Sequence, residues 1–174
     1  MKLQFIDTLG HVFRGAVAAL LLGNLAAVAQ AQQVQCPTNP GRFAPMADSA
    51  RVLDRYTGLI WKRCSEGQTW NGSMCTGTAT THTHEAAMIL AGQAPAGWRL
   101  PNVRELESLQ DIGCVNPAID RVAFPNTPHM EAFWTTTPFN YSNNQAWEVG
   151  FGAGGVGYAN RSSANRVRLV RNVP

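Results

Sequence analysis

Four cysteines constrain this chain more than any other feature of its sequence. They are Cys36, Cys64, Cys75 and Cys114. In an exported chain an even number of cysteines indicates a disulfide framework, and four cysteines allow three pairings. We favour Cys64–Cys75, because the glycines and asparagine between these residues let the chain double back, and this leaves Cys36–Cys114 as the second bond. No C-x-x-C pair, the spacing typical of zinc sites, occurs.

The first 31 residues have the order of a secretory signal peptide. Lys2 and Arg14 precede an apolar run over residues 16–28, and the segment ends in Ala29-Gln30-Ala31, a small-residue site for signal peptidase. The apolar run is shorter than the roughly 20 residues of a membrane helix. We therefore expect cleavage after Ala31, export to the periplasm, the cell surface or the medium, and no membrane span in the mature chain.

Residues 32–174 are long enough for one domain with a hydrophobic core. Prolines and glycine over residues 36–47 predict an irregular N-terminal segment, residues 32–50, ahead of a folded domain over residues 51–174. The formal net charge of the whole chain is +3. This near balance of charges argues against a nucleic-acid partner. The oligomeric state does not follow from the sequence.

Turn residues and apolar spacing predict an α+β fold. Asp54 and Gly58 separate two apolar runs, which predicts a hairpin over residues 51–61. Thr83 is a suitable N-cap for a short helix that ends at Gly92. These early elements are expected to precede most of the strands.

A second short helix is predicted from Asn102, which forms a capping box with Glu105, to Leu109. Strand composition follows, and we expect the last strands to form an antiparallel meander. The predicted strands are residues 133–137, 146–151, 156–159 and 167–170. Long loops, including residues 65–81, connect the elements.

Five short blocks of this sequence resemble one family in their order and spacing. They are Thr57-Gly58-Leu59-Ile60-Trp61, Trp98-Arg99-Leu100-Pro101-Asn102 followed by Glu105-Leu106, Phe124-Pro125-Asn126-Thr127, Phe133-Trp134-Thr135-Thr136-Thr137, and Val167-Arg168-Leu169-Val170-Arg171. The chain resembles the Lcl C-terminal domain family, exported bacterial domains named after a collagen-like adhesin. The resemblance extends from about Val52 to Arg171.

The resemblance implies a C-type-lectin-like fold, of the variant seen in formylglycine-generating enzymes. The adhesin that names the family binds sulfated polysaccharides and host surfaces, but this chain has no collagen-like repeat. Formylglycine-generating enzymes need two copper-binding cysteines late in the domain, whereas the last cysteine here is Cys114. We therefore expect no enzymatic activity and no cofactor.

Metal-dependent binding is not expected either. The Glu-Pro-Asn, Gln-Pro-Asp and Trp-Asn-Asp triplets with which C-type lectins bind calcium and sugar do not occur. His82 and His84 are weak metal candidates, because side chains at i and i+2 share a face only in an extended segment and the sequence shows no third ligand. A polar loop leading into a helix is the simpler interpretation.

Two groups of residues are candidates for ligand binding. The loop around Tyr141, Asn143 and Asn144 combines an aromatic ring with amides, which suits sugar hydroxyls, although a solvated hairpin loop is the alternative. Arg161, Arg166 and Arg168 are expected to form a basic surface patch for sulfate or carboxylate groups, although an ordinary charged surface is the alternative.

The tryptophans divide between the core and the surface in this interpretation. Trp61, Trp98 and Trp147 are expected in the core, whereas Trp70 is expected in an exposed loop. Trp134 is placed at the surface edge of a strand, where it joins the ligand-binding candidates.

Together these features predict an exported, non-catalytic binding module for anionic or sulfated glycans or another surface ligand. A second hypothesis is a protein-docking accessory of a cell-envelope assembly such as a pilus. A third is an enzyme of unknown type.

Overall fold

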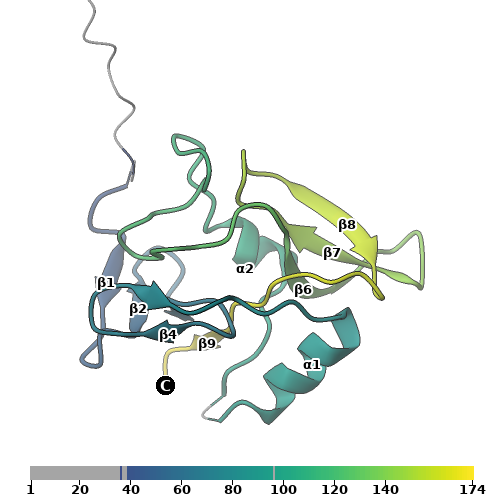
Figure 1. Ribbon diagram of the computed structural model, residues 1–174, viewed down its shortest axis with the longest axis horizontal. Helices are drawn as coiled ribbons and strands as arrows, with labels where there is room; N and C mark the ends of the chain where they lie inside the picture. Colours follow the sequence, from purple (N-terminus) through teal and green to yellow (C-terminus); the bar gives the residue numbers. More distant parts are fainter. Residues whose placement is uncertain (1–35, 37–38, 96) are drawn as a thin grey trace, which may run out of the picture. The chain divides into compact units, whose positions relative to one another are not determined.

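The structure is a computed structural model that describes Cys36 and residues 39–95 and 97–174 (Figure 1). The predicted signal peptide over residues 1–31 lies outside the described residues. The strands are β1 (Phe43–Pro45), β2 (Arg51–Asp54), β3 (Leu59–Lys62), β4 (Thr69–Trp70), β5 (Cys75–Thr76), β6 (Phe133–Pro138), β7 (Gln145–Val149), β8 (Val156–Asn160) and β9 (Val170–Asn172), and the helices are α1 (His84–Gln93) and α2 (Val103–Glu107).

Antiparallel sheets and two short helices confirm the predicted α+β class. One sheet has the order β1-β2-β3-β9, a second has the order β6-β7-β8, and β4 pairs with β5. The meander therefore consists of β6, β7 and β8. The last strand does not extend it, because β9 returns to the first sheet (Figure 1). There it pairs Val170 with Trp61 of β3.

Two segments are more regular than the sequence suggests. The segment predicted to be irregular, residues 32–50, contains β1, which pairs with β2 through Phe43 and Asp54. The predicted long loop, residues 65–81, contains the β4–β5 hairpin. Such short strands carry little periodicity of their own, and they form because a neighbouring strand offers hydrogen bonds.

The turn between β2 and β3 is built around the buried carboxylate of Asp54. This carboxylate accepts hydrogen bonds from the backbone N–H of Tyr56 and the hydroxyl of Thr57, and it forms an ion pair with Arg42 at 2.6 Å. Gly58 follows with a φ of 69°, a conformation that glycine adopts without steric cost. The turn residues therefore form the predicted hairpin.

The helices begin where their capping residues predict. The Thr83 hydroxyl accepts a hydrogen bond from Ala86 N, and Asn102 and Glu105 form the capping box that starts α2. However, α2 ends at Glu107 rather than at Leu109. Leu109 N bonds to Leu106 O three residues back, so the chain tightens into a turn that still buries the Leu109 side chain.

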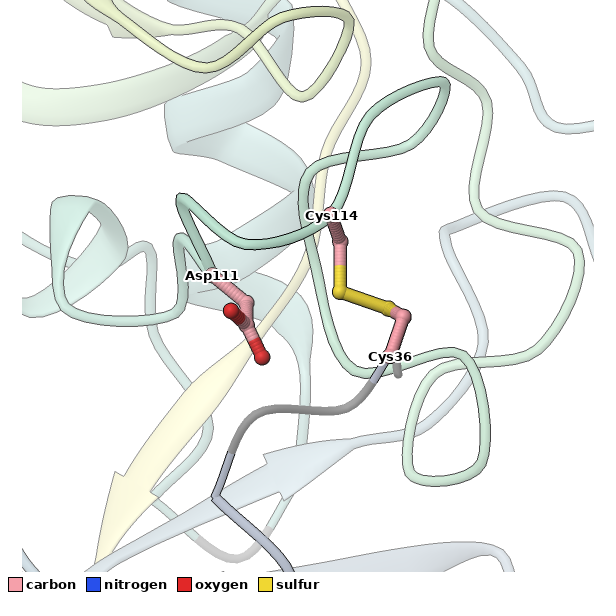
Figure 2. Close-up of side chains that lie close together, drawn as sticks. All are labelled: Cys36, Asp111 and Cys114. Carbon is pink, nitrogen blue, oxygen red and sulfur yellow. A yellow bond between two sulfur atoms is a disulfide. The ribbon is translucent and has the colours of Figure 1, made fainter. Parts of the chain in front are cut away.

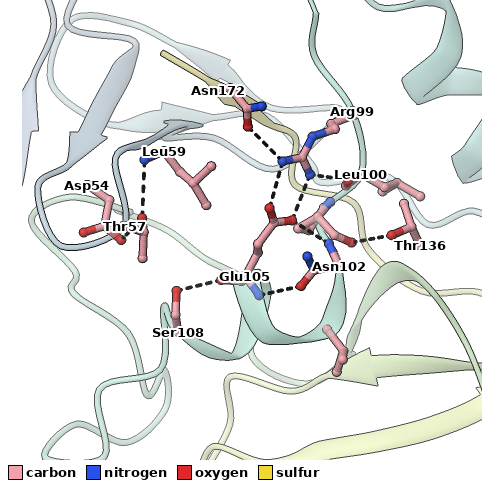
Figure 3. A network of polar contacts seen from close by, with 12 residues as sticks. Asp54, Thr57, Leu59, Arg99, Leu100, Asn102, Glu105, Ser108, Thr136 and Asn172 are labelled. Carbon is pink, nitrogen blue, oxygen red and sulfur yellow. Dashed lines mark hydrogen bonds and ion pairs between the residues drawn. The ribbon is translucent and has the colours of Figure 1, made fainter.

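The start of α2 is tied to the end of the chain by Arg99 (Figure 3). Its guanidinium makes two hydrogen bonds of 2.8 Å to the Glu105 carboxylate and a third to the side chain of Asn172 in β9. Burial alone would raise the pKa of Glu105, but hydrogen bonds from Arg99 and from Asn102 N hold the pKa below its ordinary value. This network connects α2 to the first sheet.

Both predicted disulfides are present. Cys64–Cys75 closes the loop that contains the β4–β5 hairpin, and Cys36–Cys114 joins the N-terminal segment to the loop after α2. No cysteine is free. The two bonds fasten loops that have few hydrogen-bonded neighbours of their own, which is the usual task of disulfides in small exported domains.

Two clusters of buried side chains form the core. The larger one packs Trp61 of the first sheet against Leu106 of α2 and Phe133 of β6, and the smaller one packs Ala87 of α1 against Trp134 and Leu169. Trp61 is buried as predicted, whereas Trp98, Trp147 and also Trp70 are half-buried. Within the described residues, no helix is long and apolar enough to cross a membrane.

Candidate functional site

Arg168 is a core residue and not part of a basic surface patch, so that prediction is wrong. Its side chain has no exposed surface. The guanidinium donates hydrogen bonds to the carbonyls of Lys62 and Arg63 and to the hydroxyls of Ser65 and Thr127. Burial lowers the pKa of Arg168 to about 9, partly offset by the charge of Glu66. The buried guanidinium therefore connects the segment around residues 62–65 with the loop that contains Thr127.

The prediction for Arg168 assumed that alternate residues of a strand face solvent. Residues 167–169 do not form a strand with one buried and one exposed face. Val167, Arg168 and Leu169 are all buried, although they precede β9 directly. A segment that crosses the core in this way has no solvent face, so alternation says nothing about exposure.

Arg166 is accessible but already engaged. Its guanidinium forms an ion pair with Glu131 at 2.9 Å and donates to the carbonyl of Ala79. An anionic ligand would have to compete with Glu131 for this guanidinium. Of the three predicted arginines, only Arg161 keeps donor groups toward solvent.

Trp134 is also buried completely, and the prediction that it lies at a surface edge is wrong. Its indole Nε1 donates a 2.7 Å hydrogen bond to the carbonyl of His82, and its ring packs edge-on against His84. β6 is covered by other elements on the side where Trp134 lies, so this side chain cannot contact a ligand. The Trp134 ring instead positions the segment that leads into α1.

The two histidine candidates do not converge on a metal site. His82 Nε2 lies 2.8 Å from the Thr80 hydroxyl, whereas His84 Nε2 lies 3.0 Å from the carbonyl of Thr135 in the interior. Among the described residues, one group has metal-ligand atoms close together: Cys36, Asp111 and Cys114 (Figure 2). Its two sulfurs are bonded to each other and therefore offer no thiolate.

A cleft of about 700 Å³ lies between the start of α1 and the ends of β6 and β8. It gathers residues from four separate parts of the chain. The lining residues are Thr83, His84, Glu85, Met88, Thr136, Pro138, Asn144, Arg161 and Ser162. Two of the predicted ligand-binding residues, Asn144 and Arg161, thus share one cleft with the weak metal candidate His84.

Backbone hydrogen bonds hold this cleft together. His84 N donates to Arg161 O at 2.9 Å, and Arg161 N donates to Asn144 O at 2.9 Å. The Arg161 side chain bonds through Nε to the carbonyl of Gln145 at 3.4 Å. Its two Nη groups make no hydrogen bond within the described part of the chain, so they remain available as a fork for a ligand oxygen pair.

The His84 side chain lines the cleft and carries no charge at neutral pH. Burial is the main cause that lowers its pKa, and the positive charge of Arg161 adds to it, against a smaller opposing effect of the Thr135 carbonyl. The imidazole therefore stays uncharged at neutral pH. Arg161 is then the cation of the cleft, whose lining also contains the carboxylate of Glu85.

An exposed group of aromatic rings lies on strands β7 and β8 and on the loop between β6 and β7. We call it the aromatic shelf: Phe139, Tyr141, Trp147 and Tyr158. Phe139 stacks on Tyr158 with ring centroids 4.0 Å apart and packs edge-on against Trp147 at 5.1 Å. Tyr141 is 89% exposed and Tyr158 is 52% exposed. Two phenol rings are thus held by partners and still face solvent.

Tyr141 and Asn143 are solvent-exposed in the loop between β6 and β7, as the sequence suggested, and Tyr141 contributes to the shelf. The sequence interpretation missed Phe139 and Tyr158. Tyr158 pairs directly with Trp147 across β7 and β8. Cross-strand partners share a sheet face, so pairing the two predicted strands in this register would have revealed the shelf.

The sequence was compared with known families and proteins. The Lcl C-terminal domain family matches residues 50–171. The chain belongs to the Lcl C-terminal domain family. A search among curated proteins found no match.

The blocks by which this Lcl C-terminal domain was recognised lie mostly in its scaffold. Arg99 and Glu105 form the network at α2, Trp134 is in the core, and Arg168 bonds to buried carbonyls. By contrast, Asn144, Arg161 and the aromatic shelf lie between the blocks. Membership of the Lcl C-terminal domain family thus identifies the scaffold, whereas the C-type-lectin-like comparison stays a prediction and the ligand has to be inferred from the cleft.

Proposed function

We propose that this domain is an exported, non-catalytic binding module for glycans that carry carboxylate or sulfate groups. The observation that carries the proposal is the cleft at the start of α1, where the Nη groups of Arg161 remain unbonded among hydroxyl and amide groups. A guanidinium fork binds two oxygens of one acidic group at once.

The rest of the lining suits the neutral part of a sugar. Thr136, Asn144 and Ser162 offer hydroxyl and amide groups, which both donate and accept hydrogen bonds, and Met88 and Pro138 offer apolar surface. A pyranose ring presents hydroxyls at its edge and C–H groups on its faces. The mixed lining therefore matches a sugar better than it matches a purely apolar ligand.

The charges of the cleft limit the ligand further. Glu85 lies in the same lining as Arg161, so the cleft is not strongly positive. A densely sulfated chain would meet repulsion at Glu85, whereas an oligosaccharide with spaced acidic groups would not. We expect a preference for the latter.

Two features support a binding role over a catalytic one. All four cysteines are in disulfides, so no thiolate is present for copper binding or nucleophilic attack. The buried side of His84 faces a backbone carbonyl, which fixes the ring in place.

The test is binding of the oxidised mature chain, residues 32–174, to neutral, carboxylated and sulfated oligosaccharides, with and without a chelator. We expect salt-sensitive binding to acidic glycans that persists in chelator. Arg161→Gln should weaken it about 10-fold or more, since a charge-assisted fork contributes roughly 1.5–3 kcal/mol. Arg104→Gln is the matched control, because Arg104 is 85% exposed and ion-paired to Glu107 on α2.

A second function, protein docking in an envelope assembly, is favoured by the aromatic shelf alone. Exposed tyrosines are common anchors in protein interfaces. Absence of glycan binding, together with an envelope protein that crosslinks to the native chain but not to a Tyr141→Ala variant, would favour docking over the glycan proposal.

A further inference from the structure

The outer edge of β8 has unpaired backbone groups. The order of the second sheet is β6-β7-β8, so β8 has a neighbour on one side within the described residues. Exposed edges are templates for a further strand, and proteins protect them with charges, prolines or bulges. The sequence of β8, Val-Gly-Tyr-Ala-Asn, contains no charge and no proline, and its pairing with β7 is regular over its whole length.

The hydrogen bonds at both ends of β8 determine which residues point outward. Gly150 N donates to Gly155 O, and Arg161 N donates to Asn144 O. In an antiparallel ladder, directly opposed residues alternate between bonded and non-bonded pairs. The residues of β8 that bond to β7 are therefore Gly157 and Ala159. Consequently Val156, Tyr158 and Asn160 direct their N–H and C=O groups away from β7, and of these groups Asn160 O already accepts a hydrogen bond from Ser163 N at 2.8 Å.

This edge is complementary to itself. We propose that two copies of the chain pair antiparallel through β8, about a two-fold axis at Tyr158. Tyr158 would then exchange both backbone hydrogen bonds with its counterpart. Val156 would accept a hydrogen bond from Asn160 N of the second copy and donate one to Asn160 O, which has a second lone pair beside the one that Ser163 N uses. All three residue pairs join outward-pointing groups, and the register gives partners to the backbone groups of Val156 and Tyr158 and to the N–H of Asn160.

Side chains favour this pairing on both faces. Gly157 and Ala159 oppose each other across the axis, and their small size gives no clash. On the other face the two Tyr158 rings become neighbours, each already supported by its own Phe139 at 4.0 Å. The two sheets would merge into one, and the two aromatic shelves would form a continuous surface.

The association should be weak, because one short strand per copy buries much less than the roughly 1,600 Å² of a standard interface. We expect dissociation constants on the order of 10 μM to 1 mM. Sedimentation of the oxidised mature chain over this range should show a monomer–dimer equilibrium. A monomer at every concentration would overturn the proposal.

Val156→Pro tests the edge itself, because Val156 N–H points outward and its loss leaves the bonds to β7 intact. We expect this variant to dimerise at least 10-fold more weakly with an unchanged melting temperature. The matched control is Val156→Ala, which keeps the N–H and should dimerise like the native chain. Equal dimerisation of both variants would contradict pairing through β8.

Amide hydrogen exchange gives a readout that other dimer interfaces would not produce. Exchange at Tyr158 and Val156 should slow as the protein concentration rises, whereas Gly157 and Ala159, bonded to β7, should be protected throughout. Exchange at Tyr158 that is independent of concentration in a sample that dimerises would place the interface elsewhere and refute the inference. Glycan binding through Arg161 is measured separately and does not depend on this outcome.

Discussion

Arg168 shows how one buried cation can organise several loops. Its guanidinium bonds to the carbonyls of residues 62 and 63 and to two hydroxyls, and it lies 4.9 Å from the Phe124 ring centroid. The buried positive charge is stabilised because each of these partners offers either an oxygen acceptor or the π face of an aromatic ring. The surrounding carbonyls in turn depend on this donor.

We expect Arg168→Ala to destabilise the domain by about 3–5 kcal/mol, because the substitution leaves buried carbonyls without a donor and creates a cavity. The free energy of unfolding from urea denaturation measures this. Arg161→Ala removes a half-buried side chain that lines the cleft, and should lower the free energy of unfolding by less than about 1 kcal/mol. A tolerated Arg168→Ala would show that the carbonyls find other partners.

His84 makes stability depend on pH. Because burial lowers its pKa in the folded state, the unfolded chain binds the extra proton first as the pH falls below about 6.5. Stability should therefore fall as the pH drops from about 6.5 toward the lowered folded-state pKa, and should be insensitive to His84 above that range.

The measurement is the free energy of unfolding between about pH 7.5 and 5 for the native chain and His84→Gln. In the His84→Gln variant, the free energy of unfolding should decrease less steeply than in the native chain as the pH falls below about 6.5. His129→Gln serves as the control for the removal of a histidine outside the cleft. Parallel curves for the native chain and His84→Gln would contradict this assignment.

At the scale of elements, α2 is too short to be stable alone, since isolated helices of fewer than about 12 residues are marginal. Its capping box and the Arg99–Glu105 pair hold it to β9 through Asn172. The capping box was readable from the sequence because its spacing is local. The contact with Asn172 was not, because it joins residues far apart in the chain.

Glu105→Gln should destabilise the domain by about 1–2 kcal/mol, because the neutral amide loses the charge-assisted fork to Arg99. Since the folded-state pKa of Glu105 is lowered, this contribution should be lost as the pH falls through that value. Thermal unfolding at neutral and acidic pH tests both points. Glu107→Gln, whose partner Arg104 is largely exposed, should change stability by less than about 0.5 kcal/mol.

Sequence patterns predicted elements with strong local signals and missed those that depend on neighbours. Thr83 and the Asp54 turn were recognised from residue type and spacing. The strand β1 and the return of β9 to β3 required knowledge of the tertiary fold. Of the predicted ligand-binding residues, Asn144 and Arg161 line the cleft, whereas Trp134 is buried, because burial depends on which elements cover β6.

At the scale of the whole molecule, the Cys36–Cys114 bond closes the longer loop, with a sequence separation of 78 residues. The entropy of the unfolded chain falls more when a longer loop is closed, which corresponds to about 4.5 kcal/mol for a loop of this length. Cys64–Cys75, with a separation of 11 residues, should contribute about 3 kcal/mol by the same relation.

We therefore expect a Cys36→Ser/Cys114→Ser double variant to lose more stability than Cys64→Ser/Cys75→Ser. Chemical denaturation of both variants under oxidising conditions is the measurement. The native chain under reducing conditions, with both bonds open, should be less stable than either variant. A larger loss from opening the Cys64–Cys75 bond would show that local packing outweighs loop entropy.

The Cys36–Cys114 bond also determines how this domain would respond to tension. A pull between Cys36 and the C-terminal end has a covalent path through the sulfur–sulfur bond directly to Cys114, so the backbone between the two cysteines cannot be extended while the bond is intact. That shielded part includes β1 to β5 and both helices. Under strain the extensible length is thus restricted to the residues after Cys114, and reduction of one covalent bond would lengthen the tether abruptly.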